Sequence, residues 1–105
     1  MLFEKMHNSW KARDLEGWKS CHHSEYKFVS HAMGKTMTRD DMSDEMLLGM
    51  MQTIKPENQR CIYEDNNSLV EHIVTTFASG DKEAVMAVHM KKDGLLWKTE
   101  TGATP

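Results

Sequence analysis

The sequence has few of the features that would place it in a specialised class of protein. It carries two cysteines and two prolines in 105 residues, and it has no apolar run long enough to span a bilayer. The formal charge is −3, and no basic block is longer than Lys91-Lys92. We therefore expect no nucleic-acid or membrane partner.

The two cysteines, Cys21 and Cys61, lie far apart in the sequence. We expect both to be reduced, as is usual in the cytoplasm, although a bridge between them stays open. The first residues are charged and amphipathic and do not resemble a signal peptide. The chain is thus predicted to be a single cytoplasmic domain over residues 1–105.

Motifs for metal, phosphate or dinucleotide binding are also missing. Six histidines are present, but none has the spacing of a metal site, and the side chains of the adjacent His22 and His23 diverge. No P-loop, Gly-x-Ser-x-Gly or dinucleotide motif occurs. We therefore expect neither a metal nor a cofactor.

The second half of the chain carries the strongest structural signal. Apolar-rich runs separated by turn residues predict four strands, at Gln59–Asp65, Leu69–Phe77, Glu83–Met90 and Leu95–Thr101. The Asp93-Gly94 pair is a strong hairpin signal, because both positions tolerate positive φ.

The first half reads as helical. Apolar spacing predicts helices over Leu2–Arg13 and Leu15–Cys21, then a strand over Tyr26–His31. Thr38 and Asp41 resemble a capping box that begins a third helix, which ends near Thr53. Helices followed by a meandering sheet indicate an α+β fold.

Two of the predicted strands are apolar on both sides. Since helices can cover only one face of the sheet, we expect the other face to form a homodimer. Val70, Val74, Val85 and Ala87 are the residues assigned to this outer face.

Three stretches carry a resemblance to a known family: 12–18 (Ala-Arg-Asp-Leu-Glu-Gly-Trp), 26–34 (Tyr to Gly) and 88–97 (Val to Trp). In this order they resemble the nuclear-transport-factor-like superfamily, which includes ketosteroid isomerases and SnoaL-like polyketide cyclases. The resemblance implies a cone-shaped, cystatin-like roll, in which N-terminal helices pack on a curved, mainly antiparallel sheet and leave a cavity.

The chemistry of the ketosteroid isomerases carries over poorly. His31 occupies the position of their carboxylate base, and their two oxyanion donors fall near Met6 and Val88, which cannot donate a useful hydrogen bond. Steroid-type isomerisation is therefore not expected. His31 remains the candidate acid or base, because imidazole titrates near neutral pH.

Glu71 and His72 are adjacent ionisable residues in an apolar strand, so one must face the cavity and the other the outer face. A hairpin loop at residues 78–81 would place Glu71 opposite Val88 and inside, where it could orient His31. His72 is the alternative if the register is shifted. His89 and Glu100 are interpreted as a structural cross-strand pair.

The cavity wall is expected to combine aromatic, methionine and strand residues. Met42, Met46 and Met50 recur at helical spacing, and such a stripe forms core and cavity wall together in this fold. The predicted ligand contacts are Trp10, Met46, Met50, His72, Val88 and Trp97.

Two classes of function follow from these residues. One is a lyase, isomerase or cyclase that uses His31, with Glu71, on a small apolar substrate. The alternative is a non-catalytic ligand-binding or dimeric assembly module.

Overall fold

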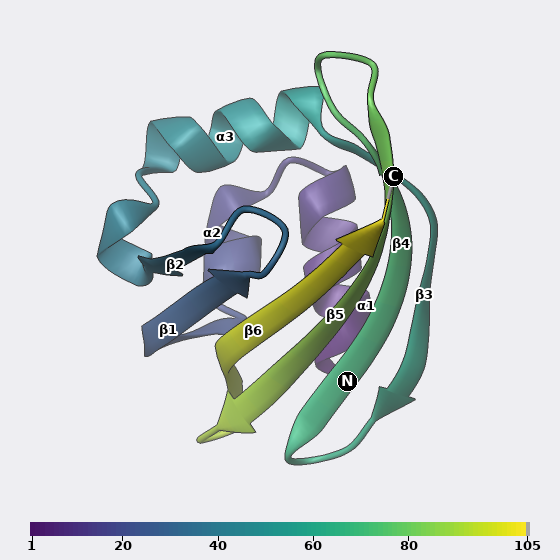
Figure 1. Ribbon diagram of the computed structural model, residues 1–105. Coiled ribbons are helices and arrows are strands. Elements are labelled where there is room, and N and C mark those ends of the chain that lie inside the picture. The colour runs from purple at the N-terminus through teal and green to yellow at the C-terminus, as the bar shows by residue number, and fades with distance from the viewer. Residues whose placement is uncertain (105) are drawn as a thin grey trace.

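The computed structural model describes residues 1–104, and a six-stranded curved sheet is its main element (Figure 1). The strand order is β2-β1-β6-β5-β4-β3. In chain order the elements are α1 (Leu2–Lys11), α2 (Leu15–Lys19), β1 (His22–Ser30), β2 (Lys35–Thr38), the 3-10 helix η1 (Arg39–Asp41), α3 (Asp44–Thr53), β3 (Lys55–Glu64), β4 (Ser68–Thr76), β5 (Lys82–Lys92) and β6 (Leu95–Thr104).

The predicted α+β cone is confirmed. Strands β3 to β6 form an antiparallel meander, and β1 joins β6 as the one parallel pair. In Figure 1, α1 and α2 lie behind the sheet and α3 lies across its upper end. The predicted Asp93-Gly94 turn is also present, with φ of 55° and 75° at its two residues.

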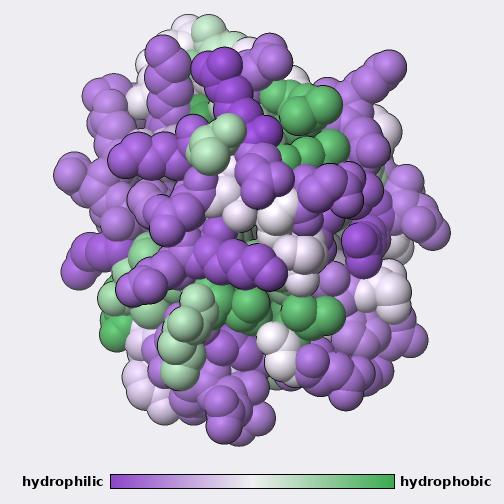
Figure 2. Space-filling view, turned by 180° about the vertical axis from the view of Figure 1, so that it is seen from behind, coloured by the Kyte–Doolittle hydropathy of each residue, from purple (hydrophilic) through white to green (hydrophobic). Residues whose placement is uncertain are grey.

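The core lies between the helices and the concave face of the sheet. Met6 of α1 packs there with Cys21, Tyr26 of β1 and Leu96 of β6. Cys21 is buried and Cys61 is exposed, and both are free thiols. On the side where α1 and α2 lie, hydrophilic residues dominate the surface and apolar residues form only small groups (Figure 2).

A carboxylate from the sheet holds the beginning of α1. Glu64 of β3 accepts hydrogen bonds from the backbone N–H groups of Leu2 and Phe3, at 2.8 and 3.3 Å. Its Oε2 also lies 2.8 Å from Nζ of Lys91. Burial raises the pKa of Glu64, but Lys91 and the two N–H groups outweigh burial and lower that pKa overall.

The predicted start and buried face of the third helix are wrong. Thr38 and Asp41 do form a capping box, but it begins η1, whereas Ser43 caps α3 by accepting from the N–H of Met46. The buried side chains of α3 are Leu47 and Met51. Met46 and Met50 of the predicted stripe are only half-buried, and Met42, which precedes α3, packs against the core.

The predicted β4–β5 register is wrong by one residue. Glu71 pairs with Ala87, and Val70 pairs with Val88. Val70 and Val74 therefore face outward as expected, but Val85 and Ala87 face inward together with Glu71. A shift of one residue exchanges the two faces of a strand.

None of the helices described within residues 1–104 is long and apolar enough to cross a membrane.

Candidate functional site

A chain of buried polar side chains crosses the concave face of the sheet. Glu71 of β4, only 2% exposed, accepts a hydrogen bond from Nε2 of His89 on β5 at 2.7 Å. Nδ1 of His89 lies 2.6 Å from Oγ1 of Thr99 on β6. The hydroxyl of Tyr26 on β1 donates to that same oxygen at 2.6 Å. Four strands therefore each contribute one member.

All the hydrogen bonds of this chain of side chains can form whether the His89 ring is neutral or charged. When the ring is neutral, Nε2–H donates to Glu71 and the Thr99 hydroxyl donates to Nδ1. When the ring is charged, both of its N–H groups donate, and Thr99 accepts from His89 and Tyr26. Burial raises the pKa of Tyr26, so its phenol stays protonated and acts as a donor.

The chain continues from Glu71 to α1. Gln59 of β3 donates from Nε2 to the second carboxylate oxygen of Glu71, at 2.9 Å. The amide oxygen of Gln59 is hydrogen-bonded to Nδ1 of His7. The His7 ring stacks on Phe3 with ring centroids 5.8 Å apart. Glu71 therefore holds Gln59, and Gln59 holds the ring of His7.

His7 and Gln59 line a cavity of about 430 Å³ between α1, the end of α3 and the start of β3. Its apolar wall consists of Trp10, Met51, Ile54 and Pro56. Its charged groups are all cationic: Lys11, Arg13 and Lys55. None of these three has an ion-pair partner among residues 1–104.

A second cavity, of about 220 Å³, lies between α2, β1, η1 and the start of α3. His22 and Tyr26 both line it. The His22 ring lies between Trp18 and Tyr26, with ring centroids 4.1 and 4.6 Å away. Burial lowers the pKa of His22 to about 4, against the raising effect of its bond to the Trp18 carbonyl.

His31 does not take the predicted position. Its side chain is 63% exposed, and its Nε2 lies 3.1 Å from Glu100. Ser30, the residue before it, pairs with the inward Thr101 across β6, so His31 follows on the outward side. The predicted His31–Glu71 pair is therefore wrong.

The other predicted residues divide between the cavity and the outer face. Glu71 faces inward, but its histidine partner is His89, so the predicted pairing of His89 with Glu100 is also wrong. Trp10 does line the larger cavity. Met46 and Met50 of α3 line neither cavity, since Leu47 and Met51 take that place.

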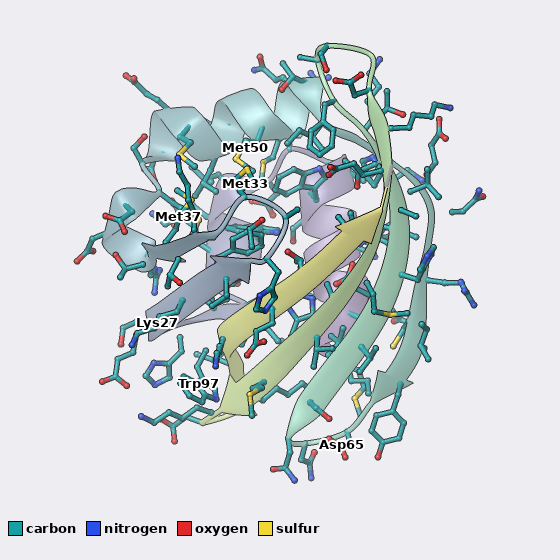
Figure 3. The ribbon with its side chains drawn as sticks, in the orientation of Figure 1. Lys27, Met33, Met37, Met50, Asp65 and Trp97 are labelled. Atoms are coloured by element: carbon teal, nitrogen blue, oxygen red, sulfur yellow. The ribbon has the colours of Figure 1, made fainter. Side chains whose placement is uncertain are left out.

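His72 and Val88 lie on the outer face, opposite Met86 and Val70. Trp97 lies at the end of the sheet where β6 begins, near Lys27 (Figure 3), and it lines neither cavity. In residues 1–104, no group of three or more histidine, cysteine or carboxylate side chains is placed to hold a metal ion.

Sequence reasoning missed His7, Gln59, Thr99, Tyr26 and His22. A signal was available only for their partner His89, which interrupts the apolar run 84–90, whereas Thr99 lies among other polar residues of β6. The helix residue His7 gave none, since it is paired only through the three-dimensional placement of Gln59.

No protein-family model matches the sequence, and no curated protein matches it. Solved structures are similar over nearly the whole chain. An NTF2-like protein of unknown function from Cytophaga hutchinsonii is 10% identical, with a TM-score of 0.76 over 99% of this chain and 88% of that one. This chain has the NTF2-like fold.

Two other structures with this fold have names that state an activity. A proposed ketosteroid isomerase from Kribbella flavida is 12% identical, with a TM-score of 0.75 over 99% of this chain and 76% of that one. A proposed polyketide cyclase from Silicibacter is 14% identical, with a TM-score of 0.73 over 98% of this chain and 86% of that one.

Replacing Glu71 tests the buried hydrogen-bond chain. Glu71→Leu leaves His89 and Gln59 without their acceptor, and we expect the free energy of unfolding to fall by about 3–5 kcal/mol. Urea denaturation measures this change. Glu57→Leu, at an exposed site on β3, is the control and should change stability by less than about 1 kcal/mol. If Glu71→Leu and Glu57→Leu lowered the free energy of unfolding equally, the buried hydrogen-bond chain would have no stabilising role of its own.

The lowered pKa of His22 predicts a dependence of stability on pH. The folded state resists a proton that the unfolded state takes up near pH 6.5, so stability falls as the pH drops from 6.5 toward 4. The full loss is about 3 kcal/mol. Urea unfolding at a series of pH values measures the slope.

His22→Gln should flatten this slope above pH about 5, because carboxylates with lowered folded-state pKa values begin to reduce stability only when the unfolded chain takes up protons below that pH. His31→Gln is the matched control, since His31 is exposed, and it should keep the wild-type slope. An unchanged slope in His22→Gln would assign the effect to another group.

Proposed function

We propose that the larger cavity binds a small organic anion with an apolar body, and that His7 transfers a proton on it. The observation that carries this proposal is a cation-lined cavity whose histidine is held, through Gln59, by the buried pair of Glu71 and His89. A small molecule of this kind fits the cavity's mixture of apolar wall and convergent polar groups.

The charges of the cavity select the class of ligand. Lys11 ends α1, Arg13 lies in the turn between α1 and α2, and Lys55 begins β3. The cavity lining contains no carboxylate opposite them. A bound carboxylate would neutralise part of this charge, and arginine favours it by donating two parallel hydrogen bonds. The ring of Trp10 and the side chains of Met51 and Ile54 suit the apolar part of such a molecule.

The hydrogen-bond chain determines which nitrogen of His7 reacts. Because the Gln59 amide donates to Glu71, its oxygen faces His7 and accepts from Nδ1–H. Nε2 then carries the lone pair and serves as the base. Glu71 and Gln59 are positioning residues, since they act through His7 and not on the ligand.

Proton abstraction next to a carbonyl is the reaction that this arrangement supports. Nε2 of His7 takes the proton, the C–H electron pair moves onto the carbonyl oxygen, and the cations stabilise the resulting charge. Returning the proton to another carbon completes an isomerisation with nothing added. The names of the isomerase and the cyclase that share this fold support this class. The alternative is binding without turnover.

Phenylpyruvate in D₂O tests binding and proton transfer together. We expect it to perturb the Trp10 indole and Gln59 amide NMR signals, and to exchange its protons next to the carbonyl faster than in buffer. His7→Gln should return exchange to the buffer rate while binding persists. The double variant Lys11→Gln/Arg13→Gln should weaken binding about tenfold, which corresponds to about 1.4 kcal/mol.

Lys5→Gln, which changes an exposed lysine outside the cavity on the same helix, is the control and should alter neither result. Binding without exchange would leave only the non-catalytic alternative. If His7→Gln still exchanged the phenylpyruvate protons faster than buffer, the role of His7 would be wrong. If the double variant Lys11→Gln/Arg13→Gln bound phenylpyruvate as tightly as the wild type, the anion site would be wrong.

The outer sheet face supports a second proposal, a homodimer. Across the sheet, Tyr63, Val70 and Val88 form an apolar transverse row that ends at Glu100. Met86 and Met90 flank this row, and both are more than two-fifths exposed. Charged and polar side chains border it, namely Lys27, Arg60, His72 and Lys98. An apolar centre with a polar rim is typical of protein interfaces, and a second copy would present the same patch.

Replacing Val88 by lysine tests the dimer. Burying an unpaired charge costs several kcal/mol, so Val88→Lys should convert dimer into monomer, as measured by analytical ultracentrifugation. Met33→Lys, at an exposed methionine in the β1–β2 turn, is the matched control and should leave the dimer intact. A wild-type monomer at micromolar concentration would rule the proposal out.

A further inference from the structure

Two residues that line the larger cavity have a backbone conformation that usually belongs to glycine. Arg13, in the turn after α1, has φ of 57°, and Asn58 of β3 has φ of 51°. One other non-glycine residue within residues 1–104 has a positive φ, Asp93 of the β5–β6 turn, and it lines neither cavity. Left-handed backbone costs free energy in residues with a side chain, and such residues cluster at binding sites.

The end of α1 explains the backbone of Arg13 but not its side chain. The N–H of Asp14 donates to the carbonyl oxygen of Ser9 at 2.8 Å. The N–H of Arg13 donates to the carbonyl oxygen of Trp10 at 3.1 Å. These two bonds form a Schellman motif, in which the left-handed position is usually glycine. Glycine at this position would end the helix with less strain, so helix termination does not account for an arginine.

The Arg13 side chain is placed to bind a molecule in the larger cavity. It is exposed, and it forms no salt bridge within residues 1–104. A guanidinium group binds a carboxylate through two parallel N–H groups, whereas a lysine offers only a point charge. Of the three cations at this cavity, Arg13 is therefore the one that can fix the orientation of a carboxylate.

Asn58 adds a neutral donor to the same cavity. It lies where the pairing of β3 with β4 shifts, between Glu57 and Arg60. Asparagine tolerates left-handed backbone better than most residues, and glycine would serve this irregularity equally well. Only asparagine adds an amide that can donate to an uncharged oxygen. It is exposed to a bound molecule and directly precedes Gln59, which holds His7.

We infer that Arg13 and Asn58 select an oxo acid, a molecule that carries both a carboxylate and a carbonyl group. This inference rests on the function proposed above for the same cavity. Arg13 binds the carboxylate, and the Asn58 amide donates to the carbonyl oxygen. When His7 takes the neighbouring proton, the C–H electron pair forms a carbon–carbon double bond and the carbonyl pair moves onto that oxygen. Asn58 then stabilises the negative charge where it develops.

Three probes with the same benzyl group separate the two contacts. Phenylpyruvate carries both groups, 3-phenylpropanoate lacks the carbonyl oxygen next to its carboxylate, and 1-phenylpropan-2-one has a methyl group in place of the carboxylate. We expect the wild-type protein to bind phenylpyruvate about tenfold more tightly than either of the others, because each of them leaves one donor without an acceptor. Titration of the Trp10 indole NMR signal measures the three affinities.

Glycine variants then assign each preference to one residue. Arg13→Gly should lose most of the preference for phenylpyruvate over 1-phenylpropan-2-one and keep the preference over 3-phenylpropanoate. Asn58→Gly should show the reverse pattern. Asp93→Gly is the matched control at a positive φ outside the cavities and should keep both preferences.

Thermal unfolding without any ligand gives an independent measurement. Arg13→Gly should raise the melting temperature by about 4 °C, because glycine takes this backbone without strain. A residue that served only the fold would lower the melting temperature when it is replaced.

The outcomes separate this inference from the proposed function. If the wild-type protein bound none of the three probes, both would be wrong. If phenylpyruvate bound but the two glycine variants kept both preferences, only the roles of Arg13 and Asn58 would be wrong. A lower melting temperature in Arg13→Gly would show that the arginine supports the fold, and it would overturn the inference for that residue.

Discussion

The burial of the Glu71 carboxylate is the constraint on which the rest of the structure depends. A buried carboxylate needs hydrogen-bond partners, and Glu71 has Gln59 of β3 and His89 of β5. Through these two it is linked to His7 of α1 and Thr99 of β6. Each partner must lie at one position of its strand, so the network fixes the inward register of β3, β4, β5 and β6. The buried carboxylate of Glu64 holds the N-terminal end of α1 against the sheet in the same way, through its hydrogen bonds with Leu2 and Phe3. Two carboxylates thereby place the helix that forms the cavity wall.

The two cavities lie near opposite ends of the same hydrogen-bond chain, and their electrostatic character differs. Gln59 and His7 belong to the larger cavity, where cations dominate, and Tyr26 belongs to the smaller one, where charges balance. The hydrogen-bond chain therefore places a fixed polar side chain in the wall of each cavity. One sheet thus forms the wall of two cavities that differ in their charged groups.

The sequence predicted the fold well because the strands, the Asp93-Gly94 turn and the helices each carry a local signal. The site was predicted poorly because it depends on register, and register is a non-local property. A one-residue shift in β5 placed Val85 outside and Val88 inside, the reverse of the structure. Glu71 was identified correctly as inward, but its partner was taken to be His31, because nothing local distinguishes His31 from His89.

The parallel pairing of β1 with β6 has a consequence for how the chain folds. The last strand lies between the first strand and β5, so β1 and β2 can join the sheet only after residues 95–104 have been synthesised. Most of the contacts of β1 therefore connect residues about seventy positions apart, as in the bond between Tyr26 and Thr99. Such long-range closure slows folding, and a chain interrupted before β6 would expose the edges of both β1 and β5.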